Sequence, residues 1–493
     1  MVILAILAFV EALLVTQPPG PGLDPDSASY MGAAESFAHG QGLRIPTADW
    51  FAPEPAAALA HFPPGLPIAL SIGVAAGISA PQTARVVNAI AFAITVAILA
   101  YLVGCSTGTL GGMAIGIALL VARPIVLVHL SVLSEPLFLA LLAATLLAMV
   151  KRAHPLVAGS YAALAALVRY AGVSVSGAVV VWELIQPREW KERLERAVLA
   201  GIPTLVLFGT WLLRTHHDRG ATIRDVGIYG GFGATLAQGA RTIAAWLIPT
   251  SDTPGTWWMV GGAVAALAVV ALIVGGVRMA RRHVEPRAAS APRILAAATM
   301  LLVCYVALIV VSRLFADPGI PFDERILAPL VLLVSAMTAV AIGASWRSLG
   351  LLLRAALLVC FAGWIVGSVL ADWDDVSWAT SNGSDFAGED WRTSPTIAWV
   401  RTNAASTPLY SNWPAALYFH VHRAAWLLPD ESDAKTVRAF ADTLARRGGV
   451  VVAFDAPSPD VAPLDSIVRR AGLRVVARLS DGTIYAPPPL TTR

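Results

Sequence analysis

The stretch that decides the fold spans residues 156–182 and has the sequence LVAGSYAALAALVRYAGVSVSGAVVVW, in which Arg169 is the only charged residue. A single helix of this length would measure about 40 Å, more than the hydrocarbon core of about 30 Å. Basic residues, which favour the cytoplasmic side, flank both ends, at 151–152 and at 188–196. We therefore predict two short helices that meet at residues 169–172, with Arg169 at the outer side of the membrane.

The composition of the 493-residue chain is that of a polytopic α-helical membrane protein. Hydrophobic residues make up 57% of the chain and charged residues 14%, against roughly 25% charged residues in soluble domains. The mean hydropathy is +0.68. The net charge is only +3, and the basic residues form short clusters rather than a patch interleaved with aromatic residues. We expect membrane lipids around the chain and no nucleic acid as a partner.

Motifs for metals and disulfides give little signal. Cys105, Cys304 and Cys360 each lie alone at or inside an apolar segment, which argues against a disulfide framework and against a thiolate metal site. The sequence has no Walker loop and no HExxH motif. Asp24 and Asp26 form an acid-x-acid pair that could bind a divalent cation, so the sequence leaves metal dependence open.

We assign each connecting loop to one side of the membrane and follow these sides along the chain, which predicts about eleven membrane crossings. Basic clusters, including Arg278 to Arg293 and Arg347, are expected in the cytoplasm. The first apolar run lacks the features of a signal peptide and is expected to be retained. Residues 64–79 contain Pro67 and Gly73, so we expect them to lie on or dip into the outer leaflet. The predicted spans are 2–15, 86–104, 110–122, 136–150, 156–168, 173–186, 197–213, 257–277, 294–312, 326–344 and 351–371. The predicted outer loops are 16–85, 123–135, 214–256 and 313–325.

A change of composition at residue 372 predicts two domains, a transmembrane domain at 1–371 and a small α/β domain at 372–493. In the second, short strand-like runs alternate with a helical pattern that Gly448-Gly449 ends. The turn Ser480-Asp481-Gly482 predicts a final hairpin. The parity of the crossings places this C-terminal domain outside the cytoplasm. Strands are expected at 408–412, 424–428, 450–455, 473–479 and 483–486, and a helix at 434–446.

The charged residues expected at the outer face suggest chemistry on a lipid-carried substrate. A carboxylate can accept the proton of an acceptor hydroxyl as that hydroxyl attacks a sugar carbon. Arginines can hold a leaving phosphate through paired, charge-assisted hydrogen bonds. With the sugar on a polyprenyl phosphate, the leaving group is already a stable anion. The residues in question are Asp24, Asp26, Glu135, Arg169, Asp323, Glu324 and Arg325.

Each of these residues also has a structural interpretation. Asp24-Pro25-Asp26-Ser27 is a good helix N-cap sequence, and Glu135 before Pro136 could be a first-turn carboxylate favoured by the helix dipole. His61 could be an ordinary loop histidine, and residues 323–325 an ordinary solvated loop. Arg169 carries the strongest signal, because an arginine inside an apolar run is costly and normally needs a partner.

Several motifs follow one another in a recognisable order. They are Asp26-Ser27-Ala28-Ser29-Tyr30 before an Ala-rich segment that ends at Gly40-Gln41-Gly42, then Pro63-Pro64-Gly65, Ser134-Glu135-Pro136-Leu137-Phe138, Leu167-Val168-Arg169-Tyr170-Ala171-Gly172 and Glu324-Arg325-Ile326-Leu327-Ala328-Pro329. In this order the chain resembles the C-type (GT-C) membrane glycosyltransferases. The resemblance is to bacterial relatives of protein O-mannosyltransferases and of the transferases that decorate lipid A with aminoarabinose.

The resemblance implies a polyprenyl-phosphate-sugar donor, bound from the outer leaflet, and an extracytoplasmic glycan, lipid or protein as acceptor. It implies that Asp26 acts as the general base, with Asp24 as a second acid, and that Glu135 is the acid of the second loop. Two departures leave the acceptor class open: the first loop lacks the family's Asp-Glu dipeptide, and Ser-Glu-Pro replaces the usual second-loop motif. We expect substrate contacts from Arg169, Tyr30, His61, Glu324 and Arg325.

The expected function is therefore glycosyl transfer in a bacterial inner membrane, with a hexose or a pentose as the sugar. A transporter or flippase of lipid-linked sugars is the rival from another class, and it would need ionisable residues in the cytoplasmic half and a midplane site. A non-catalytic envelope-binding protein would tolerate substitution of the acid loop. An oligosaccharyl ligase of the O-antigen type would use a pyrophosphate-linked, long-chain donor.

Overall fold

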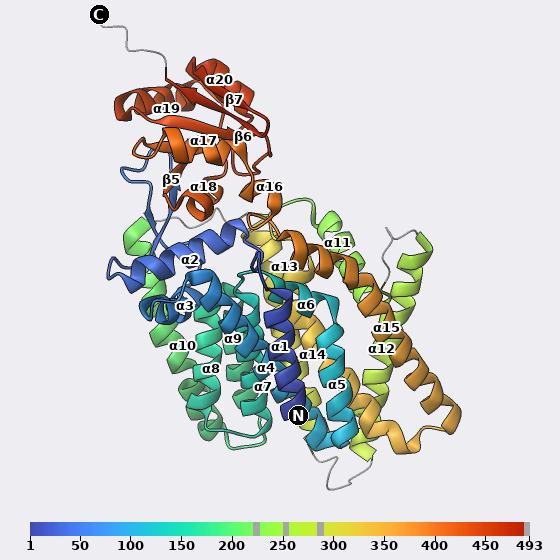
Figure 1. The fold of residues 1–493 in the computed structure, drawn as a ribbon. Coiled ribbons are helices and arrows are strands. Elements are labelled where there is room, and N and C mark those ends of the chain that lie inside the picture. Colours follow the sequence, from blue (N-terminus) through green and yellow to red (C-terminus); the bar gives the residue numbers. More distant parts are fainter. Residues whose placement is uncertain (220–226, 250–255, 283–289, 488–493) are drawn as a thin grey trace, which may run out of the picture. The chain divides into compact units, whose positions relative to one another are not determined.

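The computed structural model describes residues 1–219, 227–249, 256–282 and 290–487 (Figure 1). The chain forms two compact units, and each unit combines separate stretches of sequence. The first unit contains Met1–Gln17, Ala60–Leu66 and Ala84–Trp378. The second contains Pro18–Leu59, Pro67–Thr83 and Ala379–Arg493. Part of the predicted first outer loop therefore belongs to the same unit as the C-terminal segment.

The first unit is helical. Its core is built largely from small and branched apolar side chains, and α7, α8, α9 and α10 lie side by side (Figure 1). Two of its helices, α4 and α15, continue into the second unit. The helices are α1 Val2–Val15, α4 Ala80–Thr107, α5 Thr109–Val121, α6 Arg123–Leu130, α7 Glu135–Val150, α8 Pro155–Val168, η1 Tyr170–Gly172, α9 Val173–Leu184, α10 Trp190–Arg219, α11 Phe232–Leu247, α12 Thr256–Arg282, α13 Ala291–Phe315, α14 Glu324–Ser345, η3 Trp346–Ser348 and α15 Leu351–Asn382.

The pair of short helices predicted around Arg169 is present. Helix α8 ends at Val168, Arg169 has extended backbone angles (φ −144°, ψ 139°), and the single turn η1 leads into α9. A Cβ atom at Gly172 would lie 2.2 Å from the carbonyl carbon of Ala165, so only glycine allows η1 to fold back this closely on α8. The break in the chain at Arg169 is therefore built by local backbone geometry.

In the part of the chain that the structure describes, six helices are long and apolar enough to cross a membrane: α4, α10, α12, α13, α14 and α15. The pair α5 and α6, bent by 54°, can be counted as a seventh span. Shorter apolar helices, among them α1, α7, α8 and the segment Tyr170–Leu184, occupy other predicted spans. The protein is a multi-pass membrane protein, and the number of eleven crossings stays a prediction.

Some helices differ from the predicted spans. Helix α11 lies within the predicted outer loop 214–256, and α15 continues to Asn382, beyond the predicted change at residue 372. Residues 64–79, expected at the outer leaflet, contain the short apolar helix α3 Gly65–Ala75. Residues 283–289 of the predicted cytoplasmic basic cluster, including Arg287, lie outside the described residues.

The second unit is built on a six-stranded sheet with the strand order β2-β5-β4-β6-β8-β7. The first four strands of this order are parallel, and the last two join antiparallel. In Figure 1, α19 and α20 lie on one side of the sheet and α17 and α18 on the other. The strands are β2 Thr47–Asp49, β4 Leu409–Ser411, β5 Ala425–Leu427, β6 Val450–Phe454, β7 Arg474–Leu479 and β8 Gly482–Ala486, and the helices are α2 Pro25–Ala38, α16 Glu389–Arg392, α17 Pro395–Asn403, α18 Pro414–Val421, α19 Ala434–Arg447 and α20 Leu464–Ala471.

The first outer loop contributes an edge strand to this sheet. Strand β2 pairs in parallel with β5, with Thr47 opposite Ala425 and Asp49 opposite Leu427. A separate two-stranded ladder joins β1 Arg44–Ile45 to β3 Ala57–Ala58. The backbone of Leu23 also exchanges hydrogen bonds with Ser384 and Phe386. The segment that carries Asp24 and Asp26 is thus bound at several points to the C-terminal part of the chain.

Candidate active site

Three of the predicted site residues meet in the first unit. The Oε1 atom of Glu135 forms an ion pair with Nη1 of Arg169 at 2.5 Å, and it accepts a hydrogen bond from Nε of Arg325 at 3.0 Å. Nη1 of Arg169 also donates to Oγ of Ser134 at 3.1 Å. One buried carboxylate oxygen therefore holds two guanidinium groups that come from opposite halves of the chain.

The sequence around Glu135 explains why a carboxylate is stable there. Glu135 is the first residue of α7, Ser134 stands at the N-cap position, and Pro136 follows in the first turn. A carboxylate at this position is favoured by the helix dipole. Only 1% of Glu135 is exposed, so its charge needs the arginines as partners. Glu135 is therefore both a first-turn carboxylate of α7 and a member of an ion-pair cluster.

Arg325 is positioned by the first turn of α14. The side chain of Asp323 caps this helix by accepting a hydrogen bond from the backbone N–H of Ile326 at 3.0 Å. The hydroxyl of the buried Tyr305 donates to the carbonyl of Ile326 at 2.7 Å. Both contacts fix the residue that follows Arg325, and with it the direction from which the guanidinium approaches Glu135. Tyr305 is a residue that sequence reasoning missed, because one tyrosine in an apolar helix carries no local signal.

The described contacts of the cluster join one carboxylate to two guanidinium groups. The carboxyl of Asp323 lies near this cluster. Burial raises its pKa, and the hydrogen bond from the N–H of Ile326 and the positive charge of Arg325 oppose this rise. A site of this kind attracts an anion with oxygen acceptors, because guanidinium groups recognise phosphate and carboxylate geometry.

The helix break that carries Arg169 is fixed by neighbouring side chains. The hydroxyl of Tyr170 donates to the carbonyl of Ala60 at 3.0 Å and accepts from Nε1 of Trp211 at 3.4 Å. A Cβ atom at Gly65 would lie 2.7 Å from the carbonyl oxygen of Leu167, so the segment 60–66 packs directly on the end of α8. The Pro-Pro-Gly motif is thereby explained as a close contact with the break.

His61 and Glu324 are the other predicted site residues of the first unit. His61 is exposed, and its ring meets the ring of Phe62 edge to face at 4.7 Å. Glu324 opens α14 and is half-buried, and it forms no hydrogen bond or ion pair with another described residue.

Asp24, Asp26 and Tyr30 belong to the second unit. Asp24 is the N-cap of α2 and forms a capping box with Ser27, whose Oγ accepts from the backbone N–H of Asp24 at 3.0 Å. Asp26 lies in the first turn of the same helix and is half-buried, and 2% of Tyr30 is exposed. The cap interpretation of Asp24 is correct, and Asp26 is a first-turn acid of the same helix.

Helix α2 is held within the second unit by a buried polar contact. The hydroxyl of Tyr418, in α18, donates to Oε2 of Glu35 at 2.7 Å. Burial, with the charge of Glu35, raises the pKa of Tyr418. Nε2 of His420 lies 2.8 Å from the carbonyl oxygen of Phe386, in the segment that pairs with Leu23. The acid-bearing helix therefore has both ends tied to the C-terminal part of the chain.

A second ion-pair cluster was not predicted. Arg123, at the start of α6, contacts Asp372 at 2.6 Å and Asp375 at 2.8 Å, two acids one turn apart in α15. The spacing of three residues between the acids was the available signal. Among the described residues, no group of three His, Cys, Asp or Glu side chains has the arrangement of a metal site. Divalent-cation binding at Asp24 and Asp26 stays a prediction.

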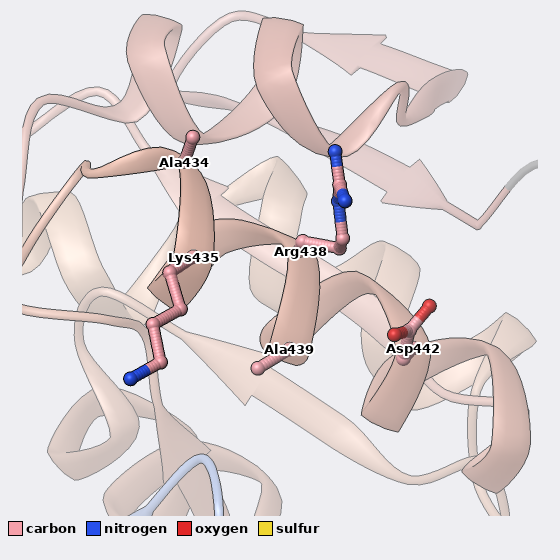
Figure 2. A pocket seen from close by; sticks show the side chains of 5 residues that line it. All are labelled: Ala434, Lys435, Arg438, Ala439 and Asp442. Carbon is pink, nitrogen blue, oxygen red and sulfur yellow. The ribbon is translucent and has the colours of Figure 1, made fainter.

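A hollow in the second unit involves none of these residues. It is lined by Ala434, Lys435, Arg438, Ala439 and Asp442, all from α19. Figure 2 shows the three charged side chains leaving this one helix in different directions. They do not converge on a common point, and we do not regard the hollow as a reaction site.

The helical first unit with its break at Arg169, and the chain as a whole, define the class of the fold: it is that of the C-type (GT-C) membrane glycosyltransferases. The chain is similar to ArnT from Cupriavidus metallidurans in its apo state, with 15% identity and a TM-score of 0.52 over 99% of this chain and 97% of ArnT. ArnT bound to undecaprenyl phosphate gives 14% identity and a TM-score of 0.50 with the same coverage.

A third similar structure is the arabinofuranosyltransferase AftD from Mycobacteria, with 15% identity and a TM-score of 0.55. The match covers 98% of this chain and 41% of AftD. No protein-family model and no curated protein matches the sequence. At these identities the likeness establishes the fold, and function has to be argued from the site.

Proposed function

We propose that the protein is a glycosyltransferase that moves one sugar from a polyprenyl-phosphate donor to an acceptor outside the cytoplasm. The observation that carries the proposal is the Glu135 cluster, in which two arginines share one buried carboxylate oxygen. Guanidinium groups are suited to a phosphate that must be bound as an ester and released as an anion. The GT-C fold supports this assignment, since ArnT and AftD are transferases of that fold.

In the proposed reaction, an acceptor hydroxyl attacks the anomeric carbon of the sugar. The new carbon–oxygen bond forms as the bond to the phosphate oxygen breaks, and polyprenyl phosphate leaves with the electron pair. Asp26 accepts the hydroxyl proton as general base, while Arg169 and Arg325 hold the phosphate. Inversion at the anomeric carbon follows from a single displacement. The proposal includes no metal in this step.

We propose a positioning role for Glu135 rather than a role as base. A carboxylate that forms ion pairs with two guanidinium groups is stabilised as the anion and is a weak proton acceptor. Its contribution is to keep two mutually repelling cations in place. The donor contacts proposed for Tyr30, His61 and Glu324 rest on the sequence resemblance alone.

The proposal also sets the protein in a bacterial inner membrane, with about eleven crossings. The unit that contains the C-terminal α/β sheet is then extracytoplasmic, together with the acid helix α2. The distribution of basic clusters supports this orientation. It predicts that a cysteine introduced at Asp49 reacts with a membrane-impermeant thiol reagent in intact cells, and that one introduced at Lys191 does not.

The test is transfer by the purified, full-length protein. It is incubated with radiolabelled polyprenyl-phosphate mannose or arabinose and with envelope extract, with and without a chelator. Appearance of label in a product other than the donor supports the proposal, and the chelator arm decides metal dependence. Movement of intact donor between the leaflets of a vesicle, without a glycosylated product, would instead indicate a flippase. Absence of both activities with all donors would favour a binding protein.

Asp26 is tested by replacement with Asn, which keeps the size of the side chain and removes its basicity. We expect Asp26→Asn to reduce transfer at least tenfold with an unchanged midpoint of thermal unfolding, because the base contributes by its charge and basicity. Asp49→Asn, at an exposed position in β2 of the same unit, is the matched control and should keep full activity. Retention of more than about a tenth of the activity in Asp26→Asn would rule out its role as base.

A further inference from the structure

Arg313 is a buried arginine outside the proposed reaction site. It lies in the last turn of α13, and 4% of the residue is exposed. Its Nε donates to Oγ1 of Thr235 at 2.9 Å and its Nη2 donates to the carbonyl of Gly230 at 3.1 Å. Nη1 is also buried, and it has no hydrogen-bond partner among the residues that the structure describes.

The partners of Arg313 carry no compensating charge. Within the described residues, Arg313 forms no ion pair with a carboxylate, and the two groups that it contacts are a hydroxyl and a carbonyl. Other part-buried arginines of the first unit do have acids: Arg169 pairs with Glu135, Arg123 with Asp372 and Arg196 with Glu183. An unpaired guanidinium inside a protein is strongly unfavourable unless an anion accompanies it.

The nearest structural element adds to the positive potential. The guanidinium lies against the N-terminus of α11, a helix of 16 residues. Its N-cap residue, Gly231, has φ +78°, and a Cβ atom there would lie 3.3 Å from Nη2 of Arg313. No side chain caps this end of the helix. The first turn therefore presents backbone N–H groups and a partial positive charge to the same region.

We infer that Arg313 and the N-terminus of α11 form a binding site for an anion of the phosphate class. A buried guanidinium nitrogen without an acceptor and an uncapped helix N-terminus are complementary to the oxygens of one phosphate group. The site is distinct from the Glu135 cluster, because it uses none of the same residues. A lipid headgroup and free phosphate share this chemistry, and the experiment separates them.

The site is connected to the segment that leads to Arg325. The backbone N–H of Phe322 donates to Oε1 of Gln238 at 3.1 Å, and Oγ1 of Thr242 donates to the carbonyl of Phe322 at 3.1 Å. Both side chains belong to α11. An anion at the start of α11 would thus stabilise the helix that holds Phe322, the residue before Asp323.

The experiment measures binding to the full-length protein in detergent by native mass spectrometry. The probes are inorganic phosphate, short-chain phosphatidic acid and the corresponding diacylglycerol, which lacks the phosphate. All binding is measured in the Arg169→Gln background, so that the proposed donor site does not contribute and the result is independent of any transferase activity. Arg313→Gln is compared with Arg293→Gln, a matched control at the other end of α13 whose Nη1 contacts the carbonyl of Val150.

We expect one phosphate-bearing probe to bind per chain, and Arg313→Gln to weaken that binding at least tenfold while Arg293→Gln leaves it unchanged. Binding of phosphatidic acid alone assigns the site to a lipid headgroup, and binding of both phosphates assigns it to the phosphate group itself. No binding of either, or equal binding to Arg313→Gln, overturns the inference. If Arg313→Gln does not fold, Arg313→Lys, which keeps the charge but loses the planar fork, replaces it and should also bind more weakly.

Discussion

At the scale of residues, the Glu135 cluster joins one buried carboxylate oxygen to two guanidinium groups that lie far apart in the sequence. Arg169 could be predicted to need a partner, because it is the only charge in a long apolar run. Glu135 and Arg325 could be nominated from motifs. That both arginines would share one oxygen of Glu135 could not be predicted, since Arg325 is 190 residues away in sequence from Glu135. The packing of α13 and α14 against α7, which brings them together, has no local signature.

Removal of the charge of Glu135 should destabilise the protein. We expect Glu135→Gln to lower the free energy of unfolding by about 3 kcal/mol, because two part-buried arginines then lose the negative charge of a buried partner. The measurement is denaturant or thermal unfolding in detergent. Glu54→Gln is the control. Its pair with Arg44 is also 2.5 Å long, but the Glu54 side chain is 67% exposed and that of Arg44 41% exposed, so the expected loss is below about 1 kcal/mol. Equal effects of the two substitutions would refute the argument from burial.

The raised pKa of Asp323 predicts a pH dependence of stability. The folded protein binds the proton of this carboxyl more tightly than the unfolded chain, whose Asp pKa is about 3.9. As the pH rises from about 3.9 to the raised pKa of Asp323, its ionisation therefore lowers the free energy of unfolding. The loss of stability persists at higher pH. We expect Asp323→Asn, which keeps the N-cap, to gain stability relative to wild type over that pH interval. A difference between the two unfolding midpoints that does not change with pH would contradict this expectation.

At the scale of elements, the helix break at Arg169 was predictable because charge and length together excluded one upright helix. The strands of the C-terminal sheet were predictable for a different reason: alternating residues and glycine turns mark them locally. Helix α11 was not predicted, because the residues before it are rich in glycine and the segment itself contains few charged residues. The bend between α5 and α6 was not predicted either, because Pro124 falls in the predicted outer loop 123–135.

The close approach at Gly172 makes a sharp prediction for the helix pair. We expect Gly172→Ala to lower the midpoint of thermal unfolding and the rate of transfer, because its Cβ atom would collide with the backbone of α8 at Ala165. Gly177→Ala, five residues later in α9, is the control. A Cβ atom there meets nothing within 4 Å, and helix propensity favours alanine by up to about 1 kcal/mol. A neutral Gly172→Ala would show that the break does not depend on this contact.

At the scale of the whole molecule, the sequence did not reveal that the second unit is assembled from distant segments. Strand β2 has only the three residues Thr47, Ala48 and Asp49, too few for an alternating pattern. Its partner β5 lies in the C-terminal part of the chain. Pairing between such short segments is decided by tertiary packing rather than by local preference, and no single-sequence pattern reports it.

This interleaving predicts the effect of truncation. We expect a chain that ends at Trp378 to lose protection from hydrogen exchange at residues 18–59, because β2 loses its ladder partner and Glu35 loses the hydroxyl of Tyr418. Residues 135–172, in the first unit, serve as the internal control and should keep their protection. Unchanged exchange at residues 44–49 in the truncated chain would contradict the assembly described above.

The pairing of β2 with β5 also sets an order of events during biosynthesis. Ala425 follows its partner Thr47 by 378 residues, which at about 5–20 residues per second corresponds to a delay of roughly 20 to 75 s. During that interval the segment with the acid helix has been made but its sheet has not. The ribosome therefore completes nearly all of the membrane helices before the loop that bears Asp26 can reach its final conformation, and a nascent chain arrested before residue 425 should hold that loop unfolded.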